Sequence, residues 1–300
     1  MTISTNQTRN GVINAVSSYV MWGFAPLYFK LLANIDASEI LIHRVVWSCF
    51  LLAIIVIFAN KWRFVQVILK QPKLMIQLSI TATILAINWF LFIWAINNEH
   101  LLDASLGYFI NPIFSVALGV VFLGERLGRW KKIAVFLAVL GVLIQLVILG
   151  SLPIISLALA GTFGTYGLLR KKMAVDSFVG LLFESALMVP VAVIYWWFFT
   201  DSASSNMFTN EFNINIILIL AGVVTTAPLL CFTAAAKRLT LSALGFFQYI
   251  GPSIMFALAT FLYHEPLAPT KLITFALIWL ALIIFSLDSL KALKLSKGVN

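Results

Sequence analysis

Residues 101–123 read LLDASLGYFINPIFSVALGVVFL and carry one charged side chain, Asp103. A helix needs about 20 mostly apolar residues to cross the hydrocarbon core of a bilayer, so this stretch is long enough to span a membrane. The whole chain of 300 residues is similar, because 62% of its residues are hydrophobic and 10% are charged. Soluble domains carry about 25% charged residues. The composition therefore predicts an all-α polytopic membrane protein and excludes a soluble globular fold.

Charged residues, prolines and asparagines interrupt the apolar sequence and divide it into ten candidate transmembrane helices. The first is too long for the apolar segment of a cleaved signal peptide, so we expect it to be retained. Both cysteines, Cys49 and Cys231, fall within candidate spans and predict no disulfide framework. The ten spans lie at residues 11–32, 39–59, 74–96, 101–123, 132–150, 152–169, 177–199, 214–236, 239–262 and 271–288.

The basic residues predict how the spans are oriented. Of the 20 Lys and Arg residues, all but Lys30, Arg44 and Lys271 lie in loops or termini on one side of the predicted topology. Loops rich in Lys and Arg stay in the cytoplasm, so we expect both termini there. The net charge of +9 is explained by this topology, and we expect no nucleic-acid partner.

The second half of the sequence repeats features of the first half at an offset of about 140 residues. Residues 241–262, LSALGFFQYIGPSIMFALATFL, align with the stretch quoted above. The pairs Pro112/Pro252 and Glu125/Glu265 keep the same spacing in both halves. The halves 1–150 and 151–300 each hold five spans, an odd number, so they cross the membrane in opposite directions.

Inverted repeats are typical of secondary transporters, because two similar bundles can expose a central site alternately to either side of the membrane. The repeat therefore favours a transport function. A duplicated membrane protein without a transport role is the alternative.

Several segments together resemble the RarD-type branch of the EamA family, in the drug/metabolite transporter superfamily. The resemblance covers nearly the whole chain and rests on WGFAP at 22–26 with YFK at 28–30, EILIHR at 39–44, NW at 88–89 with FIWA at 92–95, SLGYFINP at 105–112, GER at 124–126 and LGFFQYIGP at 244–252. The sequence HEP at 264–266 departs from the family pattern, which more often has a small residue before the acid.

The resemblance implies a carrier of the bacterial inner membrane with ten transmembrane helices in two EamA repeats. In such carriers, spans one to four and six to nine surround a central cavity, and spans five and ten lie at the periphery. Members of this branch are often called chloramphenicol-sensitive proteins or chloramphenicol resistance permeases.

Ionisable side chains inside a span usually face a cavity or a partner, which makes them candidates for substrate binding or ion coupling. Glu39 and His43 are four residues apart and share one helix face. Arg44 keeps its charge and would anchor an anionic substrate, or else reach outward to a carboxylate or a lipid phosphate. Glu184 enters from the opposite side, and a buried carboxyl group can hold a proton for coupled transport or serve as a structural hydrogen-bonding group.

Prolines and polar aromatic side chains complete the set of candidates. Pro112 and Pro252 each remove a helix donor and are candidate hinges, with simple helix bending as the alternative. Other side chains would line a cavity for small, partly aromatic solutes, although Trp and Tyr near span ends are commonly interfacial anchors. These cavity candidates are Trp22, Tyr28, Asn88, Trp89, Trp94, Tyr108, Asn111, Gln248 and Tyr249.

The sequence as a whole predicts a secondary active transporter that exports a small organic metabolite or drug by alternating access, coupled to protons. The alternatives are a facilitative uptake permease for an anionic metabolite and an integral-membrane enzyme acting on a lipid-linked substrate. We expect no cofactor and no catalytic residue. Glu39 and His43 lack the further ligands that a metal site needs, so no metal site is expected either. The expected partners are a small-molecule substrate, the lipid bilayer and protons.

Overall fold

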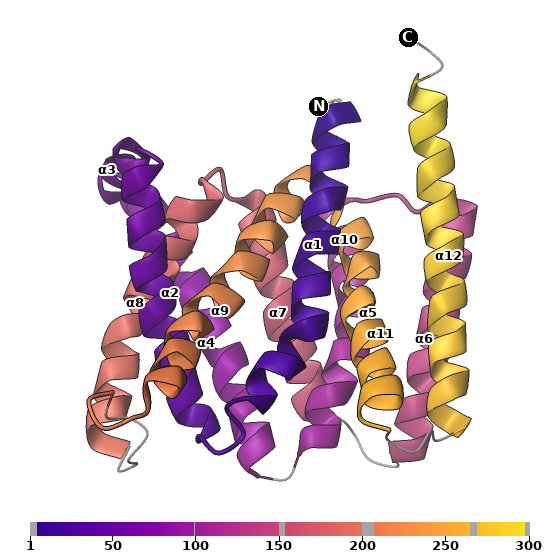
Figure 1. Cartoon of the computed structure of the whole chain (residues 1–300). Coiled ribbons are helices and arrows are strands. Elements are labelled where there is room, and N and C mark those ends of the chain that lie inside the picture. Colours follow the sequence, from indigo (N-terminus) through magenta and orange to yellow (C-terminus); the bar gives the residue numbers. More distant parts are fainter. Residues whose placement is uncertain (1–4, 99, 150–153, 200–206, 265–268, 298–300) are drawn as a thin grey trace.

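Helices form all the regular secondary structure in the computed structural model, which describes residues 5–98, 100–149, 154–199, 207–264 and 269–297. The long helices run up and down in a bundle, with the beginning of α1 and the end of α12 at the same end (Figure 1). This end is termed the terminal end, and the other is the opposite end. The prediction of an all-α fold is confirmed for the described residues.

The helices follow the predicted spans closely, with two differences. The short helix α3 was not predicted as a separate element, because its single apolar face, which buries Val65 and Ile68, is too short to span a membrane. The predicted span 239–262 is divided into α10, α11 and a π-helical turn, η2. The elements are α1 (Thr5–Lys30), α2 (Ala37–Phe58), α3 (Trp62–Leu69), α4 (Pro72–Asn97), α5 (Leu101–Leu123), α6 (Arg129–Leu149), α7 (Ile154–Lys172), α8 (Ser177–Phe199), α9 (Phe212–Arg238), α10 (Leu241–Gln248), α11 (Ile250–Ala257), η2 (Leu258–Leu262) and α12 (Pro269–Lys297).

Seven segments among the described residues are long and apolar enough to cross a membrane. The other three predicted spans coincide with α1, α7 and α12, whose polar or basic ends lower the mean hydropathy of the helix. The ten-span count and the sides on which the termini lie stay predictions. The seven segments are Ala37–Phe58, Pro72–Ala95, Leu106–Leu123, Arg129–Val147, Ser177–Phe198, Phe212–Arg238 and Leu241–Leu262.

The outward faces of the helices are apolar. In α8, for example, the carboxyl group of Glu184 is fully buried, whereas Val191 and Trp197 are 68% and 82% exposed. This arrangement reverses that of a soluble helix, which keeps its charged residues outside. It suits a bundle whose surface is covered by lipid.

The packing of helices in the first half corresponds to the packing in the second half. Helix α1 packs against α9 and α11, as α7 packs against α4 and α5. Helix α2 packs against α8 and α9, as α8 packs against α2 and α4. Helices α6 and α12 pack against each other and lie together at one side of the bundle (Figure 1).

Glu125 joins the end of α5 to the beginning of α10. Gly124 ends α5 with a positive φ of 63°, a conformation that costs glycine little, and the chain turns back there. The Glu125 carboxylate then accepts hydrogen bonds from the amides of Leu241 (2.5 Å) and Ser242 (2.9 Å), at the first turn of α10. Glu265, its partner in the sequence repeat, lies outside the described residues.

Candidate functional site

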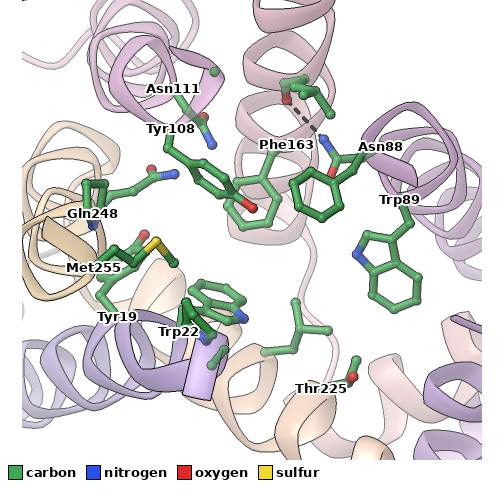
Figure 2. A pocket seen from close by; sticks show the side chains of 18 of the residues that line it. Tyr19, Trp22, Asn88, Trp89, Tyr108, Asn111, Phe163, Thr225, Gln248 and Met255 are labelled. Carbon is green, nitrogen blue, oxygen red and sulfur yellow. Dashed lines mark hydrogen bonds between the residues drawn. The ribbon is translucent and has the colours of Figure 1, made fainter. Parts of the chain in front are cut away.

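A cavity of about 310 Å³ lies between helices of both halves of the chain (Figure 2). It occupies the part of the bundle toward the opposite end, because Phe29 lies in the last turn of α1, and Gly107 and Leu159 lie near the beginnings of α5 and α7. Among the described residues, α3, α6, α8 and α12 contribute nothing to the lining. The lining residues are Tyr19, Trp22, Ala25, Pro26, Phe29, Arg44, Asn88, Trp89, Phe92, Gly107, Tyr108, Asn111, Leu159, Phe163, Thr225, Leu229, Gln248, Gly251, Pro252 and Met255.

Aromatic rings form much of the cavity wall. Trp22 lies edge-on to Phe163 with ring centroids 5.7 Å apart, and the rings of Tyr19 and Trp22 pack at 5.6 Å. Phe92 and Tyr108 make a second edge-to-face pair at 6.1 Å. Such walls present flat apolar surfaces to a bound solute.

Arg44 brings a positive charge to this aromatic cavity. Its Nε donates a hydrogen bond to Thr225 Oγ1 at 2.9 Å. The guanidinium carbon lies 5.0 Å from the ring centroid of Trp89 and 5.5 Å from that of Phe29, within the range of cation–π attraction. No carboxylate of a described residue forms an ion pair with Arg44.

The amide side chains in the cavity differ in how far their hydrogen bonds are satisfied. Asn88 Nδ2 donates to the carbonyl of Leu159 at 3.0 Å and to Thr162 Oγ1 at 2.8 Å, so it joins α4 to α7. Asn111 Oδ1 and the Tyr19 hydroxyl are buried and have no hydrogen-bond partner. Leaving such groups unsatisfied is costly, which makes them candidates for contact with a solute.

Both candidate hinge prolines act on the cavity. A proline within a helix leaves the carbonyl four residues earlier without its usual donor. For Pro112 and Pro252 these carbonyls belong to Tyr108 and Gln248, and both residues line the cavity. Helix α5 nevertheless continues through Pro112, whereas the boundary between α10 and α11 falls at Tyr249, three residues before Pro252.

Eight of the predicted site residues lie in the lining of the cavity. They are Trp22, Arg44, Asn88, Trp89, Tyr108, Asn111, Gln248 and Pro252. The hydroxyls of Tyr28 and Tyr249 instead donate to backbone carbonyls of α9 (2.7 Å) and α5 (3.2 Å). Trp94 stacks on His100 with ring centroids 5.5 Å apart. These three aromatic residues therefore connect parts of the fold outside the cavity.

Glu39 and His43 also lie outside the cavity, on buried positions of α2. The Nδ1 atom of His43 accepts a hydrogen bond from Trp47 Nε1 at 3.1 Å, within the same helix. No group of three or more potential metal ligands occurs among the described residues.

Glu184 lies in a buried polar cluster in the half of the bundle nearer the terminal end. Its Oε1 is 2.5 Å from Thr81 Oγ1, and its Oε2 accepts a hydrogen bond from the Tyr166 hydroxyl at 3.1 Å. Arg170 Nη1 is 3.5 Å from Glu184 Oε1, close enough for an ion pair but without hydrogen-bond geometry. The sequence placed Arg170 in a cytoplasmic loop, but the structure leaves this side chain only 1% exposed, since α7 continues beyond it.

Some lining residues were not among the predicted candidates. Tyr19, Phe29, Phe92 and Phe163 are aromatic residues within apolar spans, where no local signal separates a cavity wall from helix packing. The sequence could have indicated Thr225, because it is a polar residue in the middle of the apolar span 214–236.

An ion pair joins the two halves at the terminal end. Lys61 Nζ, in the loop after α2, lies 2.5 Å from Oδ2 of Asp176, in the loop before α8. The other carboxylate oxygen of Asp176 accepts hydrogen bonds from the amides of Phe178 (3.0 Å) and Val179 (3.3 Å), so Asp176 is the N-cap of α8. Partial burial raises the pKa of Asp176, but the hydrogen bond from Lys61 and those from the two amides outweigh it and hold this pKa below its ordinary value.

Replacing Asp176 with alanine should lower the free energy of unfolding by about 0.5–2 kcal/mol at neutral pH, because the helix loses its N-cap. A lowered pKa in the folded state means that the carboxylate stabilises the fold fully above about pH 3.9, the ordinary value, and that this contribution is lost as the pH falls through the folded-state pKa. Thermal unfolding between pH 7 and pH 3 measures the effect. Asp176→Asn is the control, since asparagine also caps helices but does not titrate. Equal midpoints for the alanine variant and the parent at pH 7 would contradict the assignment.

The fold and the cavity define a class of protein, a polytopic helical membrane protein with a solute-sized site that helices of both halves of the chain enclose. The profile of the EamA-like transporter family matches residues 9–147. The chain is 53% identical over 292 residues to an uncharacterized transporter of Vibrio cholerae serotype O1, covering 97% of each chain. It is 50% identical over 288 residues to protein RarD of Escherichia coli strain K12, covering 96% of this chain and 97% of that one.

A more distant relative is the chloramphenicol-sensitive protein RarD of Pseudomonas aeruginosa, 30% identical over 288 residues and covering 95% of this chain and 96% of that one. One solved crystal structure superposes with a TM-score of 0.74 over 92% of this chain and 97% of the other. At 14% identity that likeness shows the fold alone.

The chain belongs to the EamA-like transporter family, in the branch of the RarD proteins. It is accordingly a transporter and a multi-pass protein of the bacterial inner membrane.

Proposed function

We propose that the chain is a secondary active transporter that exports a small organic solute by alternating access, in exchange for protons. Ten transmembrane spans form two inverted EamA repeats, 1–150 and 151–300, with both termini in the cytoplasm. The observation that carries the proposal is the cavity, because helices of both halves of the chain contribute to its lining.

The positions of the lining residues support the two inverted repeats. Three pairs of lining residues are separated by the repeat offset of about 140 residues. The pairs are Trp89/Leu229, Tyr108/Gln248 and Asn111/Gly251. The corresponding packing of helices in the two halves supports the same division. The family profile also ends at residue 147, close to the proposed boundary between the repeats.

The charges at the terminal end support its assignment to the cytoplasm. The loops and helix ends there carry most of the basic residues, among them Lys61, Arg126 and Lys172. The cavity then lies toward the periplasm. The Lys61–Asp176 ion pair and the Glu125 cap on α10 both connect the two repeats at the cytoplasmic end. This arrangement is that of an outward-facing state, and opening to the cytoplasm requires these contacts to break.

The proton site of the proposed exchange is Glu184. A fully buried carboxyl group is neutral or charged according to its partners. The partners of Glu184 are Thr81 on α4 and Tyr166 and Arg170 on α7. A change in its protonation would alter the packing of α8 against α4 and the contacts of Glu184 with the α7 side chains Tyr166 and Arg170. Because Glu184 does not line the cavity, this coupling acts through helix packing rather than through contact with the solute.

Facilitative uptake of an anionic metabolite is a second candidate, and the positive charge of Arg44 in the cavity favours it. The direction of flux separates the two. An exporter accumulates solute in inside-out vesicles when their lumen is acidified, whereas a facilitator only equilibrates it. Chloramphenicol belongs in the solute panel because a relative from Pseudomonas aeruginosa is named for sensitivity to it.

Alternating access predicts that linking the repeats at the cytoplasmic end stops transport. The variant Lys61→Cys/Asp176→Cys, in a background with Cys49 and Cys231 replaced by serine, is treated with a short reagent that bridges two thiols through disulfides. Transport in proteoliposomes should fall in proportion to the linked fraction and return after reduction. Each single-cysteine variant under the same treatment is the control. Full transport by a completely linked protein would rule out alternating access at this end.

A further inference from the structure

The cavity carries one formal charge among the described residues, and that charge is not neutralised. Arg44 is the sole lining residue that is Lys, Arg, His, Asp or Glu. Its Nε donates a hydrogen bond to Thr225 Oγ1, and its two terminal nitrogens donate no hydrogen bond to a described residue. A guanidinium group has five N–H donors, so most of its donors are left for a ligand.

The surroundings of Arg44 leave its planar group suited to a carboxylate. Trp89 and Phe29 lie near the guanidinium, and aromatic stacking favours a fixed plane for this group. Two parallel N–H donors on a fixed plane match the two oxygens of a carboxylate, in a bidentate pair that is stronger than a neutral hydrogen bond. Arg44 is half-buried, and an anion would compensate the partial desolvation of its unpaired charge.

The other side of the cavity is polar but uncharged. Figure 2 shows Asn111, Tyr108 and Gln248 together on one side of the cavity, with Trp89 and Thr225 across from them. Asn111 Oδ1 and the hydroxyl of Tyr19 have no partner there. A cation would find no carboxylate in the described lining and would be repelled by Arg44, so cations are poorly matched.

We propose that this cavity selects flat organic monoanions, with the carboxylate held by Arg44 and an uncharged hydrogen-bonding group at the far end held by Asn111 and its neighbours. The flat body lies against the rings of Trp22 and Phe163. The proposal rests on the proposed function, because it names the class of solute that the transporter moves.

Equilibrium binding to the purified protein tests the charge preference without requiring transport. Radiolabelled para-hydroxybenzoate is the probe, and the competitors are benzoate, para-hydroxybenzamide and para-hydroxybenzylamine. We expect para-hydroxybenzoate to bind tightest, benzoate to bind more weakly, the neutral amide to bind about 10- to 100-fold more weakly, and the amine not to compete. This order in the unmodified protein needs no variant, so a folding defect cannot obscure it.

Variants then assign the preference to Arg44. Arg44→Gln should lose about 10- to 100-fold in affinity for para-hydroxybenzoate and bind the amide as well as the acid. The affinity of Arg44→Lys for para-hydroxybenzoate should fall between those of the parent and Arg44→Gln, since lysine keeps the charge but not the two parallel donors. Lys30→Gln removes the same charge from α1 outside the cavity, where Lys30 lies over the ring of Tyr263, and should bind like the parent.

Equal binding of the acid and the amide by the parent would overturn the proposal, as would an unchanged preference in Arg44→Gln. Transport assays in proteoliposomes separate this proposal from the proposed function. Transport of a neutral or cationic solute by a protein that does not bind the anions would refute the anion site and leave the transporter intact. Selective anion binding without any transport or counterflow would support the site and refute alternating-access transport of this class.

Discussion

Replacing Glu184 with alanine is expected to lower the free energy of unfolding by about 3–5 kcal/mol, the usual cost of removing one partner of a buried ion pair. Arg170 is 1% exposed, and its side-chain nitrogens already lack hydrogen-bond partners. Without the carboxylate, this cation is buried with no opposite charge beside it, and the hydroxyls of Thr81 and Tyr166 lose their shared acceptor. Chemical unfolding in detergent micelles measures the change.

The double variant Glu184→Leu/Arg170→Leu is the matched comparison. Because replacing both members of a buried pair with apolar residues is often neutral or stabilising, the double variant should regain most of the stability that the single variant loses. A double variant as unstable as Glu184→Ala would show that the ion pair is not the source of the loss. Glu184→Gln tests coupling separately, since it keeps the size of the side chain and cannot release a proton. If its transport depends on pH like that of the parent, Glu184 is not the proton site.

Replacing Gly222 with valine is expected to prevent α2 and α9 from packing. A Cβ atom on Gly222 would lie 2.5 Å from the carbonyl carbon of Trp47 and 2.7 Å from its oxygen. Both are backbone atoms of a helix and cannot rotate away, so the two helices must separate. Overpacking in a core costs about 1–3 kcal/mol, and occasionally more. With backbone as the obstacle, we expect a cost at or above the upper end of that range.

Folded yield after detergent extraction and the thermal midpoint measure this effect, with Gly222→Ala as the milder step in the series. Gly161→Ala is the matched control, because its Cβ would meet no atom closer than Phe114 Cζ at 3.8 Å. Alanine within a helix is favoured over glycine by about 1 kcal/mol, so the control should be neutral or slightly stabilised. A Gly222→Val protein that folds as well as the parent would mean that α2 and α9 are not held at this distance.

The fold class followed from the sequence because the bilayer imposes a length and a polarity on each span. The predicted span 101–123 matches α5 at both ends, since the apolar run stops at Gly124. The division of the span 239–262 was predictable only in part. Pro252 marked it as a candidate hinge, but Pro112 gave the same signal in the span 101–123, and α5 continues through that proline.

The candidate site was predictable where a rare residue type stands in an apolar span, as for Arg44 and Asn111. It was not predictable which face of each helix lies toward the cavity. Glu184 and Arg44 are both ionisable residues within predicted spans, but only Arg44 comes from a helix that lines the cavity. Tyr249 neighbours the lining residue Gln248 and turns away from the cavity, because adjacent residues on a helix point about 100° apart.

The Glu125 carboxylate has a consequence for the secondary structure of α10 itself. The first amides of any helix lack acceptors within that helix, and here a residue from the other half of the chain satisfies two of them. In the proposed alternating-access cycle the halves separate at this end, so the amides of Leu241 and Ser242 would lose that acceptor and the first turn would fray. A partial helix-to-coil transition would then accompany each cycle, and its energetic cost, about 1 kcal/mol for a typical cap, would be set by a single acidic side chain.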